Sequence, residues 1–199
     1  MKPANVGIFF DRDGTINTEV DFLSRPEDLT LIPNAATAIR EANELGLSAF
    51  LITNQSGIAR GLLTEKDLEQ VHRKLEKLLA EHGAHLDGIY YCPHHPEYGT
   101  PEYRKDCSCR KPKAGMLRQA AKEYGIDLPA SFVVGDRCVD MMASEEAGCT
   151  SVLVLTGYGT TEQEECSQHT RIDHVAPDVF AAWKFIRRTI QQRQLQASV

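Results

Sequence analysis

Two carboxylates near the start of the chain have the residue type and spacing that phosphoryl transfer requires. Asp11 and Asp13 follow an apolar run at 6–10, and Gly14 then lets the backbone turn away. Asp11 can serve as a nucleophile and a metal ligand, while Asp13, one pleat further, can donate and accept a proton at the same group. Arg12 lies between them and is expected to point to the opposite side of the strand, without a chemical role.

Two other interpretations of this pattern are available. A polar turn after a strand stays open while the motif is considered alone. A calcium-binding loop is excluded, because Thr15 and Phe22 occupy the positions where that loop requires a third Asp or Asn and a Glu.

Polar groups also follow the second apolar run, at 47–52. Thr53, Asn54, Gln55 and Ser56 offer hydroxyls and backbone N–H groups at that point. Such a segment is typical of a phosphate cradle that lacks the lysine of a Walker loop. Because the carboxyl ends of parallel strands meet at one edge of a sheet, this cradle is expected beside the two aspartates.

A third carboxylate and two cations complete the set. Asp136 follows the run at 131–134 and is suited, together with Asp11, to hold Mg²⁺ through oxygen ligands. Arg110 and Lys111 supply positive charge for a phosphate. Asp140, one helical turn beyond Asp136, is expected to support Lys111 or to cap its helix.

A second metal site is predicted in the segment 92–112, which is unusually long for a connection without regular structure. Cys92, His94, Cys107 and Cys109 provide four ligands at a spacing that suits a closed, tetrahedral, structural zinc site. A set of free thiols is the alternative for the loop, and His95 is the alternative nitrogen ligand. Because Arg110 directly follows this loop, fixing the cysteines also fixes the phosphate-binding cations.

The bulk properties limit the class of protein. The chain has 199 residues, a net charge of −6 and a pI of about 5.6, so nucleic-acid binding is not expected. No stretch has the length and hydropathy of a membrane span or a signal-peptide core. Six cysteines in such a chain indicate thiols or metal ligands and a cytoplasmic location. A monomer is expected, since no apolar stripe is left over after the core is assigned.

Short apolar runs alternate with helical segments and must position these groups. The runs are 6–10, 47–52, 88–91, 131–134 and 151–155, and the predicted helices are 35–45, 65–82, 116–124, 139–147 and 177–196, the last followed by a polar tail. The helix ends are marked by the capping pair Thr64 and Asp67 and by Gly46, Gly83, Gly125 and Gly148. This alternation predicts an α/β fold, a doubly wound, mostly parallel, Rossmann-like sheet with helices on both faces. One domain, 1–199, is expected, with the zinc loop at 92–109 and no large cap domain.

The ordered motifs resemble those of the haloacid dehalogenase-like phosphatases over about residues 5–160. The matching residues are Asp11, Asp13, Gly14, Thr15, Thr53, Asn54, Lys111, Gly135, Asp136 and Asp140. The resemblance implies that Asp11 forms an aspartyl phosphate and that Asp13 is the acid and base. It also implies that Thr53, the Asn54 backbone and Lys111 hold the phosphoryl oxygens. Mg²⁺ would lie between Asp11, the Asp13 carbonyl and Asp136.

A narrower resemblance, to the D-glycero-D-manno-heptose-1,7-bisphosphate 7-phosphatases, rests on the strings at 88–96, 54–61 and 109–112. It implies release of the C7 phosphate in the synthesis of nucleotide-activated heptose. Arg110 would recognise the second phosphate, and Glu19, Val20, Asp21 and Phe22 would line the sugar site. Arg137 is expected either to touch substrate or to be a solvated cation, and Arg60 to be a loop cation.

Two alternatives remain open at this point. Histidinol-phosphate phosphatases share the zinc loop, so another small-molecule phosphatase on the same scaffold is the first. A non-catalytic, zinc-stabilised binding module is the second, and it is disfavoured because such a module has no need of both Asp11 and Asp13.

Overall fold

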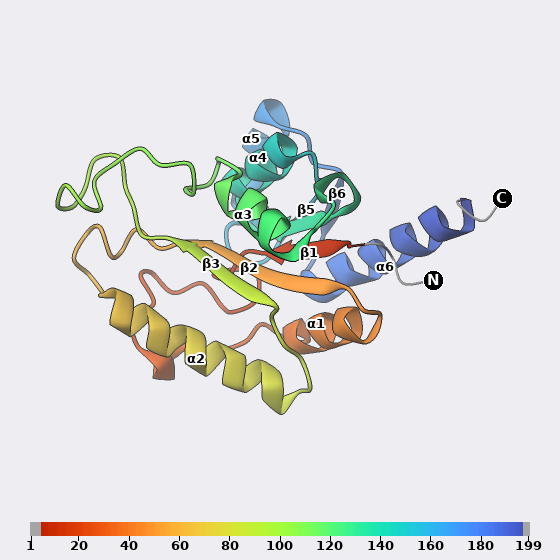
Figure 1. The fold of residues 1–199 in the computed structure, drawn as a ribbon, viewed down its shortest axis with the longest axis horizontal. Helices are drawn as coiled ribbons and strands as arrows, with labels where there is room; N and C mark the ends of the chain where they lie inside the picture. The colour runs from red at the N-terminus through yellow and green to blue at the C-terminus, as the bar shows by residue number, and fades with distance from the viewer. Residues whose placement is uncertain (1–4, 197–199) are drawn as a thin grey trace.

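The computed structural model describes residues 5–196 and contains one six-stranded sheet in which every neighbouring pair is parallel (Figure 1). The strand order is β3-β2-β1-β4-β5-β6. The order reverses between β1 and β4, and in doubly wound sheets the ligand binds at the carboxyl ends of strands at such a switch point. The predicted fold class is confirmed.

Five of the six strands coincide with the predicted apolar runs. They are β1 (Gly7–Phe10), β2 (Ser48–Asn54), β3 (Gly88–Cys92), β4 (Phe132–Gly135) and β5 (Thr150–Val154). The edge strand β6 (His174–Ala176) was not predicted, because it has only three residues and begins with a polar one. So short a segment gives no period-two signal.

Four predicted helices and the C-terminal one are present. They are α1 (Ala35–Glu44), α2 (Glu65–Glu81), α3 (Gly115–Tyr124), α4 (Cys138–Ala147) and α6 (Val179–Gln196). The helix α5 (Gly159–His169) was not predicted, since only Gly159 and Cys166 of its residues are buried and its hydrophobic period is weak. The polar tail predicted after α6 lies outside the described residues.

Each face of the sheet has its own hydrophobic core. Ile8, Phe10 and Leu51 point to the face covered by α1, α2 and α6, where Trp183 is the largest buried side chain. Phe9 and Phe50 point to the face covered by α3 and α4, and α5 packs beside α4 over β5 (Figure 1). Helices on both faces explain why the strands are apolar on both sides.

The helix-end signals in the sequence also appear in the structure. Thr64 and Asp67 form a reciprocal capping box at the start of α2. Gly125 and Gly148 occupy the C-cap positions of α3 and α4 with φ of 68° and 76°, a region that favours glycine.

The connections at the carboxyl edge of the sheet are the only long ones in residues 5–196. Between β1 and α1 the only helix is the short 3-10 helix η1 (Pro26–Asp28), and the segment between β3 and α3 projects on the left of Figure 1. Neither insertion is a cap domain. Within the described part of the chain, no helix is both long and apolar enough to cross a membrane.

Candidate active site

A cavity of about 380 Å³ opens at the carboxyl edge of the sheet, above β1, β2 and β4. Its lining includes every predicted substrate-binding residue: Glu19, Val20, Asp21, Phe22, Thr53, Asn54, Gln55, Ser56, Arg110, Lys111 and Arg137. Asp11 and Asp13 also line it. Segments far apart in the sequence therefore meet at the predicted edge.

Lys111 lies between two buried carboxylates at the base of this cavity. Its Nζ atom lies 2.6 Å from Asp11 Oδ1 and 2.6 Å from Asp140 Oδ1, and it donates to the carbonyl of Ile52 at 3.0 Å. Burial alone would lower the pKa of Lys111, but Asp11 and Asp140 outweigh it and raise the pKa. Lys111 is therefore a fixed cation held at Asp11.

Asp140 has both of the roles expected of it. Besides its contact with Lys111, it accepts a hydrogen bond from the backbone N–H of Arg137 at 3.0 Å, which caps the start of α4. Its carboxylate thus links the helix that follows Asp136 to the lysine that contacts Asp11.

Asp136 directly follows β4 and is fully buried. Its Oδ2 accepts from the backbone N–H of Tyr158 at 2.8 Å, whereas its Oδ1 has no hydrogen-bond partner among the described residues. A Cβ atom at Gly14 or at Gly157 would collide with Oδ2, so only glycine permits this close approach of two loops.

The cluster of Asp11, Asp136 and Asp140 fits a divalent cation. Ligand atoms of the three side chains lie within 4.8 Å of one another, and Lys111 supplies only one compensating charge. Burial, followed by the charges of neighbouring carboxylates, raises the pKa of Asp136 to about 9. Burial also raises the pKa of Asp11 to about 6 against the effect of Lys111. The excess negative charge and the unpartnered oxygen of Asp136 are what an oxygen-ligated Mg²⁺ requires.

Asp13 is held by a network that the sequence analysis did not foresee. Arg12 donates from Nε to Asp13 Oδ1 at 3.1 Å and from Nη2 to Oδ2 at 2.8 Å. Asn17 and Gln55 add one hydrogen bond each at 3.0 Å. The expectation that Arg12 points away without a role is wrong: its fully buried guanidinium turns back to form a bidentate pair with its neighbour.

Two sets of hydrogen bonds fix the residues of the predicted phosphate cradle at the carboxyl end of β2. Thr53 Oγ1 accepts from Gln55 Nε2 at 2.8 Å, which fixes its hydroxyl beside the aspartates. The Asn54 side chain exchanges two hydrogen bonds with the Lys111 backbone, at 3.0 and 3.1 Å. Asn54 therefore ties the β2 end to the segment that carries the lysine.

The other wall of the cavity carries Glu19 and Arg137. Burial, with help from Asp13 and Asp11, raises the pKa of Glu19 to about 7. Arg137 pairs with Glu162 at 2.7 Å and lies over the ring of Tyr158 at 4.6 Å. Tyr158 and Arg60 also line the cavity and were not predicted to do so. Tyr158 belongs to no motif with a recognisable spacing, and Arg60, although it lies in the string at 54–61, was expected to be only a loop cation.

The predicted zinc ligands converge. The Sγ atoms of Cys92, Cys107 and Cys109 lie 3.2 to 3.5 Å apart, and His94 Nδ1 lies 3.6 and 3.4 Å from the Sγ atoms of Cys92 and Cys109. Zn–S bonds of about 2.3 Å place the ligand atoms of a tetrahedron roughly 3.7 Å apart, so this donor set and its spacing fit zinc. The alternative ligand His95 is not part of the cluster.

The chain is similar to known proteins of one hydrolase family. The HAD-hydrolase-like family model matches residues 108–182. The D-glycero-beta-D-manno-heptose-1,7-bisphosphate 7-phosphatase of Photorhabdus laumondii is 41% identical over 182 residues, which cover 91% of this chain and 96% of that protein. The enzyme of the same name from Escherichia coli is 43% identical over 83% of this chain and 87% of its own length.

Solved structures agree with these relatives. The crystal structure of D,D-heptose 1,7-bisphosphate phosphatase from B. bronchiseptica, complexed with magnesium and phosphate, has a TM-score of 0.83 and 33% identity. That match covers 92% of this chain and 99% of the other.

Proposed function

We propose, because this chain belongs to the D-glycero-D-manno-heptose-1,7-bisphosphate 7-phosphatase family of HAD-like hydrolases, that it removes the C7 phosphate of this sugar bisphosphate. The observation that carries the chemistry is Asp11, buried at the base of the cavity and paired with Lys111 at 2.6 Å. The relatives, 41–44% identical and matched over most of their length, carry the substrate assignment.

In the proposed first step, a carboxylate oxygen of Asp11 attacks phosphorus in line. The bond from phosphorus to the sugar oxygen breaks, and this oxygen takes a proton from the carboxylic acid of Asp13. The products are the heptose 1-phosphate and an aspartyl phosphate on Asp11. Lys111 and the hydroxyl and backbone groups at 53–56 hold the transferring oxygens, because the reaction needs positioning and charge neutralisation.

In the second step, the Asp13 carboxylate accepts a proton from water as the water oxygen attacks phosphorus. The acyl phosphate bond breaks, which regenerates Asp11 and releases inorganic phosphate. Arg12, Asn17 and Gln55 orient Asp13 for both proton transfers.

Two metal ions belong to the proposal. Asp11, the Asp13 carbonyl and Asp136 would hold Mg²⁺, which when bound neutralises the phosphoryl oxygens. Cys92, His94, Cys107 and Cys109 would hold a structural zinc ion that fixes the loop ending at Arg110.

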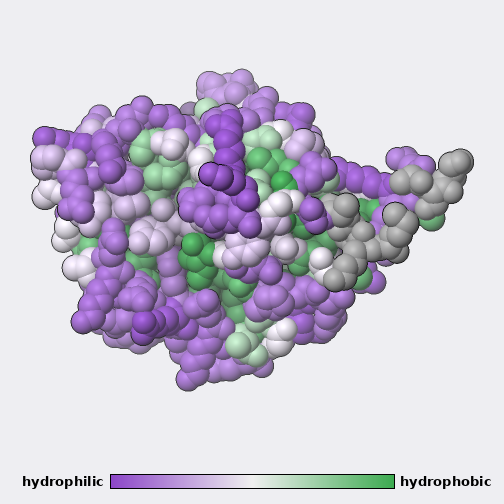
Figure 2. Space-filling model, viewed as in Figure 1, coloured by the Kyte–Doolittle hydropathy of each residue, from purple (hydrophilic) through white to green (hydrophobic). Residues whose placement is uncertain are grey.

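We also propose that the chain acts as a single-domain, cytoplasmic monomer. All six cysteines lack disulfide partners, which is typical of a reducing compartment. On the face shown in Figure 2, hydrophobic residues form small patches separated by hydrophilic ones. A larger continuous patch is typical of a stable protein–protein interface.

The test is phosphate release with Mg²⁺ from heptose 1,7-bisphosphate, histidinol phosphate and hexose bisphosphates. We expect kcat/KM for the heptose to be at least ~100-fold higher than for the others. Comparable values would contradict the proposed substrate.

Asp11→Asn should lower turnover by at least ~10⁴-fold while leaving the melting temperature close to that of the wild type, since Asn can still accept a hydrogen bond from Lys111. Retained turnover would contradict the proposed nucleophile.

A further inference from the structure

Arg12 has one guanidinium nitrogen that does not contact Asp13. Its Nε and Nη2 atoms donate to the two carboxylate oxygens of Asp13, at 3.1 and 2.8 Å. The third nitrogen, Nη1, lies 3.4 Å from Nε2 of His72, which follows sixty residues later in the chain. The fully buried guanidinium that holds Asp13 is therefore contacted by a side chain of helix α2.

His72 occupies a position on α2 where an apolar residue is expected. It lies in the same row as the buried Leu68, Leu75 and Leu79, at helical spacing, and is itself only 7% exposed. Burying an imidazole costs free energy unless its polar atoms have partners. The contact with Arg12 is therefore what distinguishes His72 from the leucines of its row.

This contact requires a neutral imidazole. A guanidinium only donates, so Nε2 of His72 must accept and the ring proton must lie on Nδ1. Burial, followed by the charge of Arg12, lowers the pKa of His72, so the ring is neutral at pH 7. His72 thus offers Arg12 an acceptor without adding a charge that would compete with Asp13.

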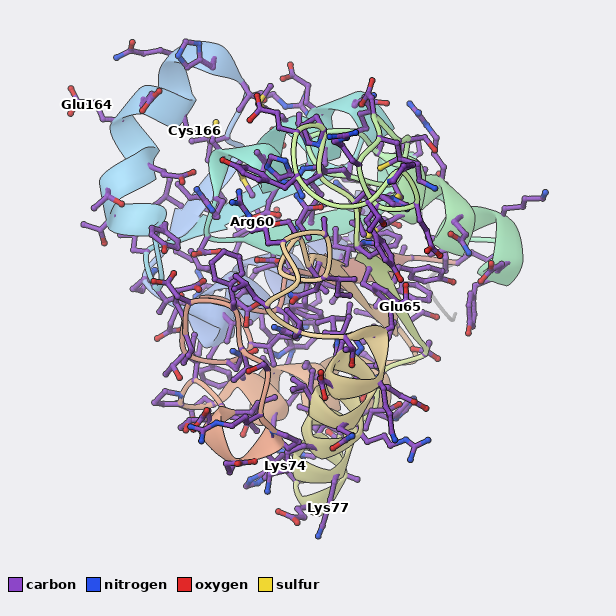
Figure 3. The ribbon with its side chains drawn as sticks, turned by 90° about the vertical axis from the view of Figure 1, so that its left-hand side faces the viewer. Arg60, Glu65, Lys74, Lys77, Glu164 and Cys166 are labelled. Carbon is purple, nitrogen blue, oxygen red and sulfur yellow. The ribbon has the colours of Figure 1, made fainter. Side chains whose placement is uncertain are left out.

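The ring of His72 is itself fixed from two elements. It meets the ring of Tyr91, on β3, edge to face, with the ring centres 6.0 Å apart. The hydroxyl of Tyr91 donates to Glu65 at 3.2 Å. Figure 3 shows Glu65 at the start of α2, the end of the helix nearer to Arg60. Helix α2 and strand β3 together therefore position the acceptor that Arg12 contacts.

The position of Arg12 determines that of Asp13. Their bidentate contact keeps the guanidinium and the carboxylate in one plane, and His72 adds a third point that opposes rotation out of this plane. Without that acceptor, a buried N–H group of Arg12 loses its partner, which favours a turn of the guanidinium towards another acceptor. Such a turn displaces the Asp13 carboxylate, and proton transfer depends on the placement of that group.

We propose that His72 is a positioning residue for the proton transfers, because it holds Arg12 from α2 and Arg12 holds Asp13. This inference rests on the proposed function, in which Asp13 protonates the sugar oxygen and then accepts a proton from water. None of the residues of α2 (Glu65–Glu81) lines the active-site cavity, so this helix acts on the acid–base group only through the buried contact.

The test is steady-state kinetics with heptose 1,7-bisphosphate and Mg²⁺, on variants shown to be folded by thermal unfolding. For His72→Leu we expect kcat to fall ~10-fold and KM to stay within ~2-fold of the wild type, because substrate still binds while Asp13 is displaced. For His72→Gln we expect kcat to stay within ~3-fold of the wild type, since the amide oxygen can still accept from Arg12.

His174→Leu is the matched control. His174 stacks on Phe185, with ring centres 3.9 Å apart, and lies outside the cavity, so its kcat and KM should equal those of the wild type. A double variant separates positioning through Arg12 from a general structural effect. Adding His72→Leu to Arg12→Met should lower kcat no further than Arg12→Met alone.

Three results would overturn the role of His72 while the wild type still hydrolyses heptose 1,7-bisphosphate, which leaves the proposed function in place. They are a folded His72→Leu enzyme with wild-type kcat, equal falls in kcat for His72→Leu and His72→Gln, and a further fall in the double variant. If the wild type does not hydrolyse this substrate, the proposed function fails and the inference about His72 fails with it.

Discussion

The side chains at the centre of the site are buried charges that hold one another in position. Lys111 contacts Asp11 and Asp140, and Arg12 contacts Asp13. Removing one partner of such a pair leaves the charge of the other buried and unpaired, so a substitution at one residue also changes the position and charge state of its neighbour. The proposed nucleophile and the proposed acid–base group thus have separate cations: Lys111 contacts Asp11, and Arg12 contacts Asp13.

Arg12 provides the first prediction at the scale of the residue. In Arg12→Met, Asp13 loses two of its four hydrogen bonds, and we expect kcat to fall ~10- to 100-fold with little change in KM. Arg25→Met is the control, because Arg25 forms the same bidentate contact with Asp28 on the surface. Steady-state kinetics measure kcat and KM for both variants, and thermal unfolding checks that each variant is folded. A folded Arg12→Met enzyme with wild-type kcat would show that Arg12 does not position Asp13.

Single residues also show where sequence reasoning succeeds and where it stops. Asp11, Asp13, Thr53, Lys111 and Asp136 could be predicted to lie at one edge of the sheet because each follows an apolar run or belongs to an ordered motif. The role of Arg12 was missed, because alternation along a strand predicts the direction of a Cβ atom and not the path of a long side chain that turns back. Arg60 was predicted to be only a loop cation, because Tyr98, the ring that it contacts most closely, lies about forty residues later in the chain.

At the scale of the element, α2 carries a buried histidine that links stability to pH. His72 is 7% exposed, and Arg12 Nη1 lies 3.4 Å from its Nε2. Burial, followed by the charge of Arg12, lowers the pKa of His72 to about 3, with Asp13 opposing the shift and the ring of Tyr91 nearby. The unfolded chain binds a proton at this residue near pH 6.5 and the native state does not, so acid favours unfolding.

We therefore expect the free energy of unfolding to fall by about 2 kcal/mol between pH 7 and pH 5 on account of His72. His72→Gln should lose that part of the pH dependence, because Gln does not titrate. Urea unfolding of both proteins at several pH values measures the difference. If the free energy of unfolding falls equally with pH in both proteins, His72 binds a proton as readily in the native state as in the unfolded chain, and this prediction is wrong.

The zinc loop is the second element with a measurable consequence. Metal analysis of protein purified without chelator should give about one zinc per chain. Removing zinc with a chelator and then restoring Mg²⁺ should raise KM for the bisphosphate ~10-fold or more, because the loop no longer fixes Arg110. Full recovery of KM with Mg²⁺ alone, in protein shown to be free of zinc, would contradict this role.

Elements were predictable to the degree that they bury an apolar face. The five predicted strands appear in the sequence as continuous apolar runs, and helix α2 shows a clear amphipathic period. Helix α5 buries only Gly159 and Cys166, and β6 has only three residues, so their positions depend on packing against α4 and β5, which a local pattern does not report.

At the scale of the whole molecule, the strand order brings the chemistry together. Asp11 follows β1 and Asp136 follows β4, and these two strands are neighbours at the point where the order reverses. The alternation of strands and helices predicted one functional edge, but strand order and the distances across the edge depend on the complete fold. Glu19, Arg60 and Arg110 surround this edge from three separate loops without a cap domain.

The most direct test of this account is chemical trapping of the intermediate on Asp11. The enzyme is mixed with heptose 1,7-bisphosphate and Mg²⁺, quenched in acid, reduced with borohydride and digested with trypsin, which cleaves after Arg12 and so separates Asp11 from Asp13. Borohydride converts an aspartyl phosphate to homoserine, and we predict homoserine at position 11 in the peptide that ends at Arg12. Reduction at Asp13, or no reduction in an enzyme that turns over this substrate, would contradict the account.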